Sequence, residues 1–265
     1  RPMLMKYAKS PDRATRKEAY EVLGKTLKAH SDQLDGIFDQ LVHVRDRMAK
    51  KMGYQNFVEL GYYRMGRLCY GPEEVKQFRE NVRRDVVPVV ARLRKEIGKK
   101  LGVDTLMLYD YDLIFPQGDP APKGGKEAIF AAAKRMYHDM SRETGEFIDF
   151  MIEHELMDLK NKPGKAATGY MTFLPDYQAP FVFSNFNQTI FDMQVLTHEL
   201  GHAFAGYMAM RSQPIAEYYS ESTDIAEIHS MSMEQFSYPY AEAFFGKDAD
   251  KFRFAHLMDA ITFVP

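Results

Sequence analysis

Apolar residues recur every three or four positions along most of this chain, which is the period of an amphipathic α-helix. Ser10 followed by Pro11 is typical of a helix start, and Gly53 is typical of the residue after a helix end. We expect Pro88 to kink the longest segment, because proline donates no backbone hydrogen bond. The pattern predicts helices over residues 11–28, 31–52, 57–65, 73–101 and 127–155.

Two short runs interrupt the helical period. Residues 168–173 and 181–186 are rich in aromatic and β-branched side chains, and a proline-containing loop joins them. They predict a small antiparallel β element before the next apolar run, so the fold class is mainly α-helical. The proline- and glycine-rich residues 116–125 predict a linker between an N-terminal helical portion, residues 1–115, and a second portion, residues 126–265.

The second portion contains the sequence His-Glu-Leu-Gly-His at residues 198–202, inside an apolar run. Residues four apart lie on the same face of an α-helix, so His198 and His202 can direct two imidazoles at one point. Glu199 projects beside that point. Two neutral nitrogen ligands and an adjacent carboxylate are what a zinc hydrolase requires. The motif therefore predicts a zinc site with Glu199 as the general base.

Catalytic zinc usually takes a third protein ligand. Residues 218–234 contain a second predicted helix, with Ser220 or Ser222 as its cap, and spacing alone does not choose among the candidate ligands on or near it. His229 is directed away from Glu227, because residues two apart do not share a helix face. The candidates are Glu221, Asp224, Glu227, His229 and Glu234.

These motifs resemble the thimet oligopeptidase and oligoendopeptidase F family of zinc metallopeptidases. In that family H-E-x-G-H precedes a glutamate ligand within T-D-φ-x-E-x-x-S-x-x-x-E, where φ is apolar, and residues 223–234 have this form. Residues 185–187, Asn-Phe-Asn, are similar to a turn of the oligoendopeptidase F branch. The resemblance implies a helical, gluzincin-type fold, a single zinc ion held by His198, His202 and Glu227, and zinc-dependent endopeptidase activity on short peptides.

Further residues are expected around such a site. Metal-bound histidines usually donate their free N–H to a carboxylate, and Asp224 and Glu234 share a helical face with Glu227. An exposed strand edge can pair with an extended peptide. Together with the resemblance, this favours four residues as substrate contacts: Gly169, Tyr170, Phe181 and Phe183.

The resemblance also identifies a missing segment. Family members carry C-terminal tyrosines, and often a histidine, that are thought to stabilise the oxyanion, whereas this chain ends at residue 265 before that segment. We therefore expect the central-to-catalytic portion of a longer protein, with an incomplete C-terminus and weak or absent turnover. Tyr238, Tyr240 and His256 do not match the missing segment and are not given its role.

Composition is that of a globular cytoplasmic protein. The net charge of −2 offers no field that would favour nucleic acid, and no apolar run is long enough to span a membrane. The single cysteine, Cys69, fits a reducing compartment. Two alternatives to the oligoendopeptidase stay open: a dipeptidyl carboxypeptidase, and a non-catalytic peptide-binding module that keeps zinc for stability. The sequence leaves the oligomeric state open.

Overall fold

The computed structural model describes residues 4, 7–166, 168–186 and 189–263, so Asn187 of the Asn-Phe-Asn turn lies outside the described residues. The chain divides into two compact units, residues 1–119 with 257–265 and residues 120–256. The predicted division into portions stays a prediction. Among the described residues, no helix combines the length and apolar character needed to cross a membrane.

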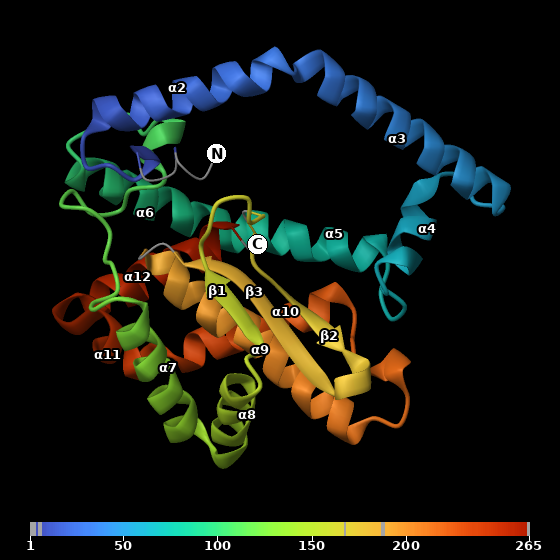
Figure 1. Ribbon diagram of the computed structural model, residues 1–265. Coiled ribbons are helices and arrows are strands. Elements are labelled where there is room, and N and C mark those ends of the chain that lie inside the picture. Colours follow the sequence, from blue (N-terminus) through green and yellow to red (C-terminus); the bar gives the residue numbers. More distant parts are fainter. Residues whose placement is uncertain (1–3, 5–6, 167, 187–188, 264–265) are drawn as a thin grey trace. The chain divides into compact units, whose positions relative to one another are not determined.

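Unit 1 is built from long helices (Figure 1). Asp12, rather than the predicted Ser10, caps the first of them, because its carboxylate accepts a hydrogen bond from the Thr15 N–H at 2.9 Å. The buried side chain of Arg16 then joins this helix to the buried Asp110, at 2.7 Å. The helices are α2 (Arg13–Ala29), α3 (Ser31–Lys51), α4 (Phe57–Arg64), α5 (Pro72–Asn81) and α6 (Val87–Lys100).

The predicted helix over residues 73–101 is divided by a π-helical turn, Val82–Val86, between α5 and α6, and the predicted kink at Pro88 stays a prediction. The Val87 N–H donates to the carbonyl of Val82, five residues back. The ring of Pro88 crowds the carbonyl four residues before it and offers no N–H, and a wider turn relieves both problems.

Unit 2 holds a three-stranded sheet and the remaining helices. Ser141 breaks the predicted helix 127–155 into α7 (Lys126–Met140) and α8 (Arg142–Glu153), because its side chain caps the second by accepting from the Thr144 N–H. The other helices are α9 (Ile190–Ser212), α10 (Thr223–Phe236), α11 (Ala241–Phe245) and α12 (Ala249–Phe263), the last of which extends into unit 1. Short 3-10 turns lie at Leu108–Asp110 in unit 1 and at Pro175–Tyr177, Ala216–Tyr218, Tyr238–Tyr240 and Gly246–Asp248 in unit 2.

The strand order is β1-β3-β2, with β1 (Met157–Lys160), β2 (Tyr170–Leu174) and β3 (Ala179–Phe186). The predicted antiparallel pair is confirmed as β2 and β3. The sequence pattern did not indicate β1, which pairs with β3 in parallel and makes the sheet mixed.

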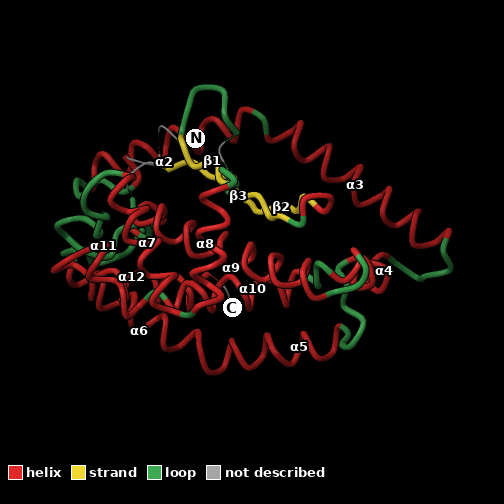
Figure 2. The backbone as a smooth tube through the Cα atoms, turned by 60° about the horizontal axis from the view of Figure 1, so that its bottom comes forward, coloured by secondary structure: helices red, strands yellow, loops and turns green. Residues whose placement is uncertain are grey.

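Helix α9 lies between the sheet and α10 (Figure 2). Alternate residues of β3, including Val182 and Phe186, are buried. Buried residues on α9 include Leu196, Leu200 and Ala203, and the apolar residues of α9 are not confined to one face of the helix, since Phe191 is exposed. The helix that carries the histidine motif is therefore a core element, and its neighbours fix its position.

Candidate metal centre

The two histidines of the motif lie one turn apart on α9, as the spacing predicts. Their ring centroids are 4.9 Å apart and the rings are nearly perpendicular, at 86°. Both side chains are partly buried, with 29% of His198 and 15% of His202 exposed.

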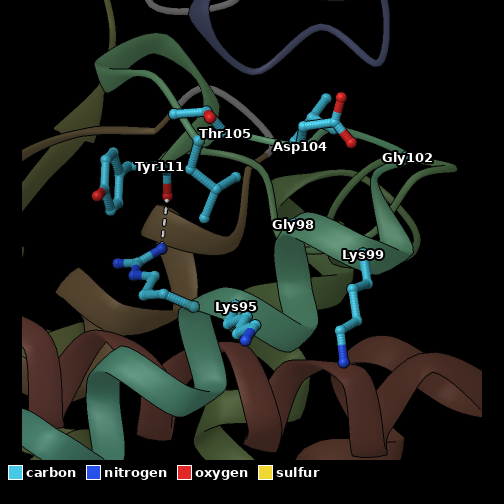
Figure 3. A pocket seen from close by; sticks show the side chains of 10 residues that line it. Lys95, Gly98, Lys99, Gly102, Asp104, Thr105 and Tyr111 are labelled. Atoms are coloured by element: carbon cyan, nitrogen blue, oxygen red, sulfur yellow. Dashed lines mark hydrogen bonds between the residues drawn. The ribbon is translucent and has the colours of Figure 1, made fainter.

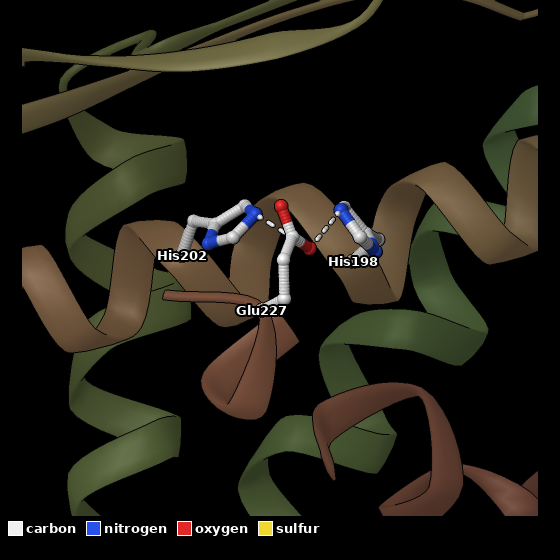
Figure 4. Close-up of side chains that lie close together, drawn as sticks. All are labelled: His198, His202 and Glu227. Atoms are coloured by element: carbon white, nitrogen blue, oxygen red, sulfur yellow. Dashed lines mark ion pairs between the residues drawn. The ribbon is translucent and has the colours of Figure 1, made fainter. Parts of the chain in front are cut away.

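Glu227 reaches the same point from α10 (Figure 4). Its Oε2 lies 3.3 Å from His198 Nε2 and 3.6 Å from His202 Nε2. Among the described residues, these three side chains form the one cluster whose ligand atoms all lie within 4.8 Å of one another. Of the third ligands that spacing left open, the structure thus brings Glu227 to the histidine pair.

The close packing of α9 on α10 depends on Gly201. A Cβ at this position would lie 2.8 Å from Ser230 Cα and 3.0 Å from the carbonyl oxygen of His229, both backbone atoms of α10. Only a residue without a side chain allows this approach, which carries Glu227 to the histidines.

The donor set fits a zinc ion. Tetrahedral zinc has bonds of about 2.0–2.1 Å to nitrogen and oxygen, so its ligand atoms are about 3.3 Å apart. The separations of 3.3 and 3.6 Å from the Glu227 oxygen to the two imidazole nitrogens are close to that value. Two imidazoles and a carboxylate are also the ligand types of catalytic zinc sites.

Further contacts hold two of the candidate ligands in place. Glu234 Oε1 lies 2.5 Å from His198 Nδ1, on the ring edge away from Glu227, and its predicted role as the carboxylate behind a metal-bound histidine stays a proposal. The buried Ser230 donates its hydroxyl to Glu227 Oε2 at 2.8 Å. Sequence reasoning gave Ser230 no role, although its position three residues after Glu227 on one helix face was the available signal.

Asp224 and His229 occupy other positions on α10. Asp224 is exposed, and its predicted contact with a metal-bound histidine stays a prediction. His229 Nδ1 pairs with Glu221 Oε1 at 2.8 Å. Glu221 and His229, two of the candidate ligands, are therefore paired with each other. The pairing is consistent with the predicted direction of His229, away from Glu227.

Burial and neighbouring side chains shift the pKa values of Glu199, His202 and His198. Burial raises the pKa of Glu199, and the nearby carboxylates of Glu227 and Glu234 raise it further against the opposing charge of His198. Burial also lowers the pKa of His202, which favours the neutral ring that a metal requires. Burial alone would lower the pKa of His198, but its hydrogen bond to Glu234 raises it on balance.

The β2 end of the sheet lies beside Glu199. A Cβ on Gly169 would be 3.3 Å from Glu199 Oε1, so the backbone here passes close to the carboxylate. Tyr170 follows at the start of the edge strand, and its ring stacks on Phe183 with centroids 5.0 Å apart. Phe181 and Phe183 are half-buried on β3, and their assignment as substrate contacts stays a proposal.

A separate cavity lies in unit 1, away from these residues in the sequence (Figure 3). Its volume is about 760 Å³, it is open to solvent, and its lining includes Lys95, Lys99 and Arg94 of α6. Lys99 pairs with Glu96 at 2.8 Å, and Arg94 donates to the carbonyl of Tyr111 at 3.2 Å. Lys99 and Arg94 therefore already have partners within unit 1. Among the described residues, the lining of this cavity holds no cluster of metal-ligand side chains like that of His198, His202 and Glu227.

Comparison with known proteins gives matches over most of the chain. The family model described as Peptidase family M3 matches residues 6–116 and 133–256. Group B oligopeptidase PepB of Streptococcus agalactiae serotype III (strain NEM316) is 25% identical over 239 residues, which are 85% of this chain and 36% of that protein.

Solved structures match more closely. A crystal structure of a proposed oligoendopeptidase F is 48% identical with a TM-score of 0.94, and the match covers 99% of this chain and 46% of the other. PZ peptidase A with an inhibitor is 47% identical with a TM-score of 0.94, at the same coverage of 99% and 46%. The chain therefore spans less than half the length of these relatives.

Proposed function

Because the chain belongs to peptidase family M3, we propose that it carries the zinc-dependent catalytic site of an oligoendopeptidase that hydrolyses peptide bonds in short peptides. The observation that carries the proposal is the convergence of His198, His202 and Glu227 within 4.8 Å, with Glu199 on the same turn as His198. The relatives' names, an oligopeptidase and an oligoendopeptidase F, support the substrate class.

His198, His202 and Glu227 would hold the ion, which supplies Lewis-acid chemistry by polarising a carbonyl and acidifying water. Glu199 acts as the general base that takes a proton from the attacking water and delivers it to the leaving amine. Its raised pKa, caused first by burial, suits a group that must both accept and release a proton.

The sheet supplies a path for the substrate. β2 is an edge strand, and an extended peptide added to it would be held through backbone hydrogen bonds with little demand on side-chain identity. Gly169, beside Glu199, leads directly into this strand. Short peptides of varied sequence are therefore the proposed substrates.

The proposed location is the cytoplasm. The cysteine Cys69 is exposed and not in a disulfide, which fits a reducing compartment.

The test compares zinc content and cleavage of a fluorogenic short peptide in the parent and in Glu199→Gln. The variant keeps the shape of the side chain but cannot accept a proton, so we expect unchanged zinc content and a loss of at least about 100-fold in hydrolysis. Glu217→Gln, which changes an exposed carboxylate of the same unit, is the control and should retain the parental rate. If the parent hydrolyses the peptide above the uncatalysed background, an equal rate in Glu199→Gln would refute the general-base role.

A further inference from the structure

Glu234 joins two histidines from distant parts of the sequence. Its Oε1 accepts from His198 Nδ1 at 2.5 Å, and its Oε2 is in short contact with Nε2 of His256 on α12. The Glu234 side chain is 13% exposed and that of His256 is 4% exposed. The carboxylate therefore uses both of its oxygens to link a candidate metal ligand to a buried imidazole.

The ring of His256 is held on its other edge as well. The hydroxyl of Tyr238 lies 2.6 Å from His256 Nδ1. The imidazole also stacks near Phe252, with centroids 5.8 Å apart and planes 26° apart, and lies edge-on to Tyr238. A flip of this ring would place carbon atoms opposite both hydrogen-bonding partners, so the contacts define one orientation.

Tyr238 is itself anchored through its backbone. Arg253, also on α12, donates from Nε and Nη2 to the carbonyl oxygen of Tyr238, at 3.1 and 2.8 Å. The same guanidinium contacts both oxygens of Glu242 at 2.9 Å. The hydroxyl that faces His256 is thus attached to a fixed segment between α10 and α11.

These contacts fit a direction of donation that runs from Tyr238 through His256 to Glu234. Burial and the charge of Glu234 raise the pKa of Tyr238, so the hydroxyl keeps its proton and can donate to His256 Nδ1. Nε2 of His256 then carries the hydrogen that Glu234 accepts, and the second Glu234 oxygen accepts from His198 Nδ1. His198 Nε2, which faces Glu227, is left with the lone pair that a metal requires.

We propose that Tyr238 and His256 are positioning residues for the metal ligand His198 and act on it through Glu234. Neither residue belongs to the ligand set or to the general base, and the inference rests on the proposed zinc site. A buried histidine with only a structural role would stabilise the fold without changing the affinity for zinc. If His256 positions His198, its replacement lowers both the stability of the fold and the affinity for zinc.

The experiment measures zinc affinity by competition with a chromogenic chelator for the parent, His256→Leu, His256→Gln and Tyr238→Phe. The glutamine side-chain amide can replace the Nε2 donor toward Glu234, whereas leucine cannot. Loss of the donor should weaken zinc binding about 10-fold in His256→Leu, within the range seen when partners of metal ligands are removed, and His256→Gln should restore most of it. Tyr238→Phe should weaken zinc binding by less than His256→Leu does, because the His256 ring keeps its contact with Glu234 but loses the donor that sets its tautomer.

The control is His138→Leu, which removes a histidine whose Nε2 contacts Asp149 at 3.1 Å on a neighbouring helix. It should leave zinc affinity unchanged. Circular dichroism of the metal-free proteins reports folding, and ¹⁵N-histidine NMR of the parent reports the tautomer of His256 without any metal or activity. An Nε2–H tautomer is expected, and an Nδ1–H tautomer would overturn the proposal.

The two ideas fail in different ways. Parental zinc affinity in a folded His256→Leu would overturn the positioning role while leaving the zinc site intact. If His256→Leu does not fold, Tyr238→Phe with unchanged affinity and an unchanged His256 signal would overturn it. A parent that binds no zinc would refute the proposed function together with the inference.

Discussion

Replacing Gly201 by alanine should separate α9 from α10. The added Cβ would lie 2.8 Å from Ser230 Cα and 3.0 Å from both the His229 carbonyl oxygen and Met233 Cβ. Non-bonded carbons are in favourable contact at about 3.5–4.0 Å, so α10 must move by about 0.7 Å. Overpacking of this kind costs about 1–3 kcal/mol and alanine brings a gain of about 1 kcal/mol to a helix, so the free energy of unfolding should fall by up to about 2 kcal/mol.

The same movement should weaken zinc binding, because α10 carries Glu227. Metal sites tolerate ligand displacements of only about 0.2 Å, so a shift of about 0.7 Å should lower zinc affinity by at least about 10-fold. Zinc affinity from chelator competition and the free energy of unfolding from denaturant titration measure the two effects separately.

Two other glycine-to-alanine substitutions serve as controls. Gly36 on α3 has no atom within 4 Å of an added Cβ, so alanine should stabilise the protein by up to about 1 kcal/mol. A Cβ added to Gly206 on α9 would clash with the ring of Phe173 on β2 and not with α10. Gly206→Ala should therefore lower the free energy of unfolding while leaving zinc affinity unchanged. A Gly201→Ala protein with parental zinc affinity and stability would refute the packing argument.

Two predictions concern buried charges. Burial disfavours the charge of Asp110, but the hydrogen bonds from Arg13, Arg16 and the Met107 N–H prevail and lower its pKa from 3.8 to about 2. A lowered carboxyl pKa adds stability that is present above pH 3.8 and lost as the pH falls toward 2, so about 2 kcal/mol should disappear over this window in denaturant titrations. Asp110→Asn should abolish this component, and an unchanged pH dependence would contradict it. Lys165 is 3% exposed and donates to the carbonyls of Asp158, Lys160 and Ser184. Lys165→Met should lower the free energy of unfolding by about 3 kcal/mol. The control Lys162→Met removes a 55% exposed partner of Asp158 and should change it by less than about 1 kcal/mol. Equal effects of the two substitutions would refute the stabilising role of Lys165.

The parts of the fold that sequence could predict are those fixed by local pattern. Helix α3 and the strands β2 and β3 lie where periodicity and composition predict them, and the family resemblance is confirmed. Strand β1 was missed because four residues carry little periodic signal and its partner β3 lies more than twenty residues later. The cap at Asp12 was misplaced because Ser10-Pro11 offers a competing start signal two residues earlier.

The candidate site follows the same division. The positions of His198 and His202 follow from helical geometry alone. Glu227 lies on another helix, so spacing left several carboxylates open, and the family resemblance was needed to choose among them. His256 reaches Glu234 only because α12 packs beside α10, and nothing local in the sequence encodes that contact.

The most direct test of the zinc site is a crystal structure of the zinc-loaded protein with anomalous diffraction recorded at the zinc absorption edge. We predict one strong anomalous peak about 2.0–2.2 Å from Nε2 of His198, Nε2 of His202 and a carboxylate oxygen of Glu227. A protein that takes up zinc elsewhere, with the Glu227 carboxylate beyond bonding distance of the metal, would contradict the account.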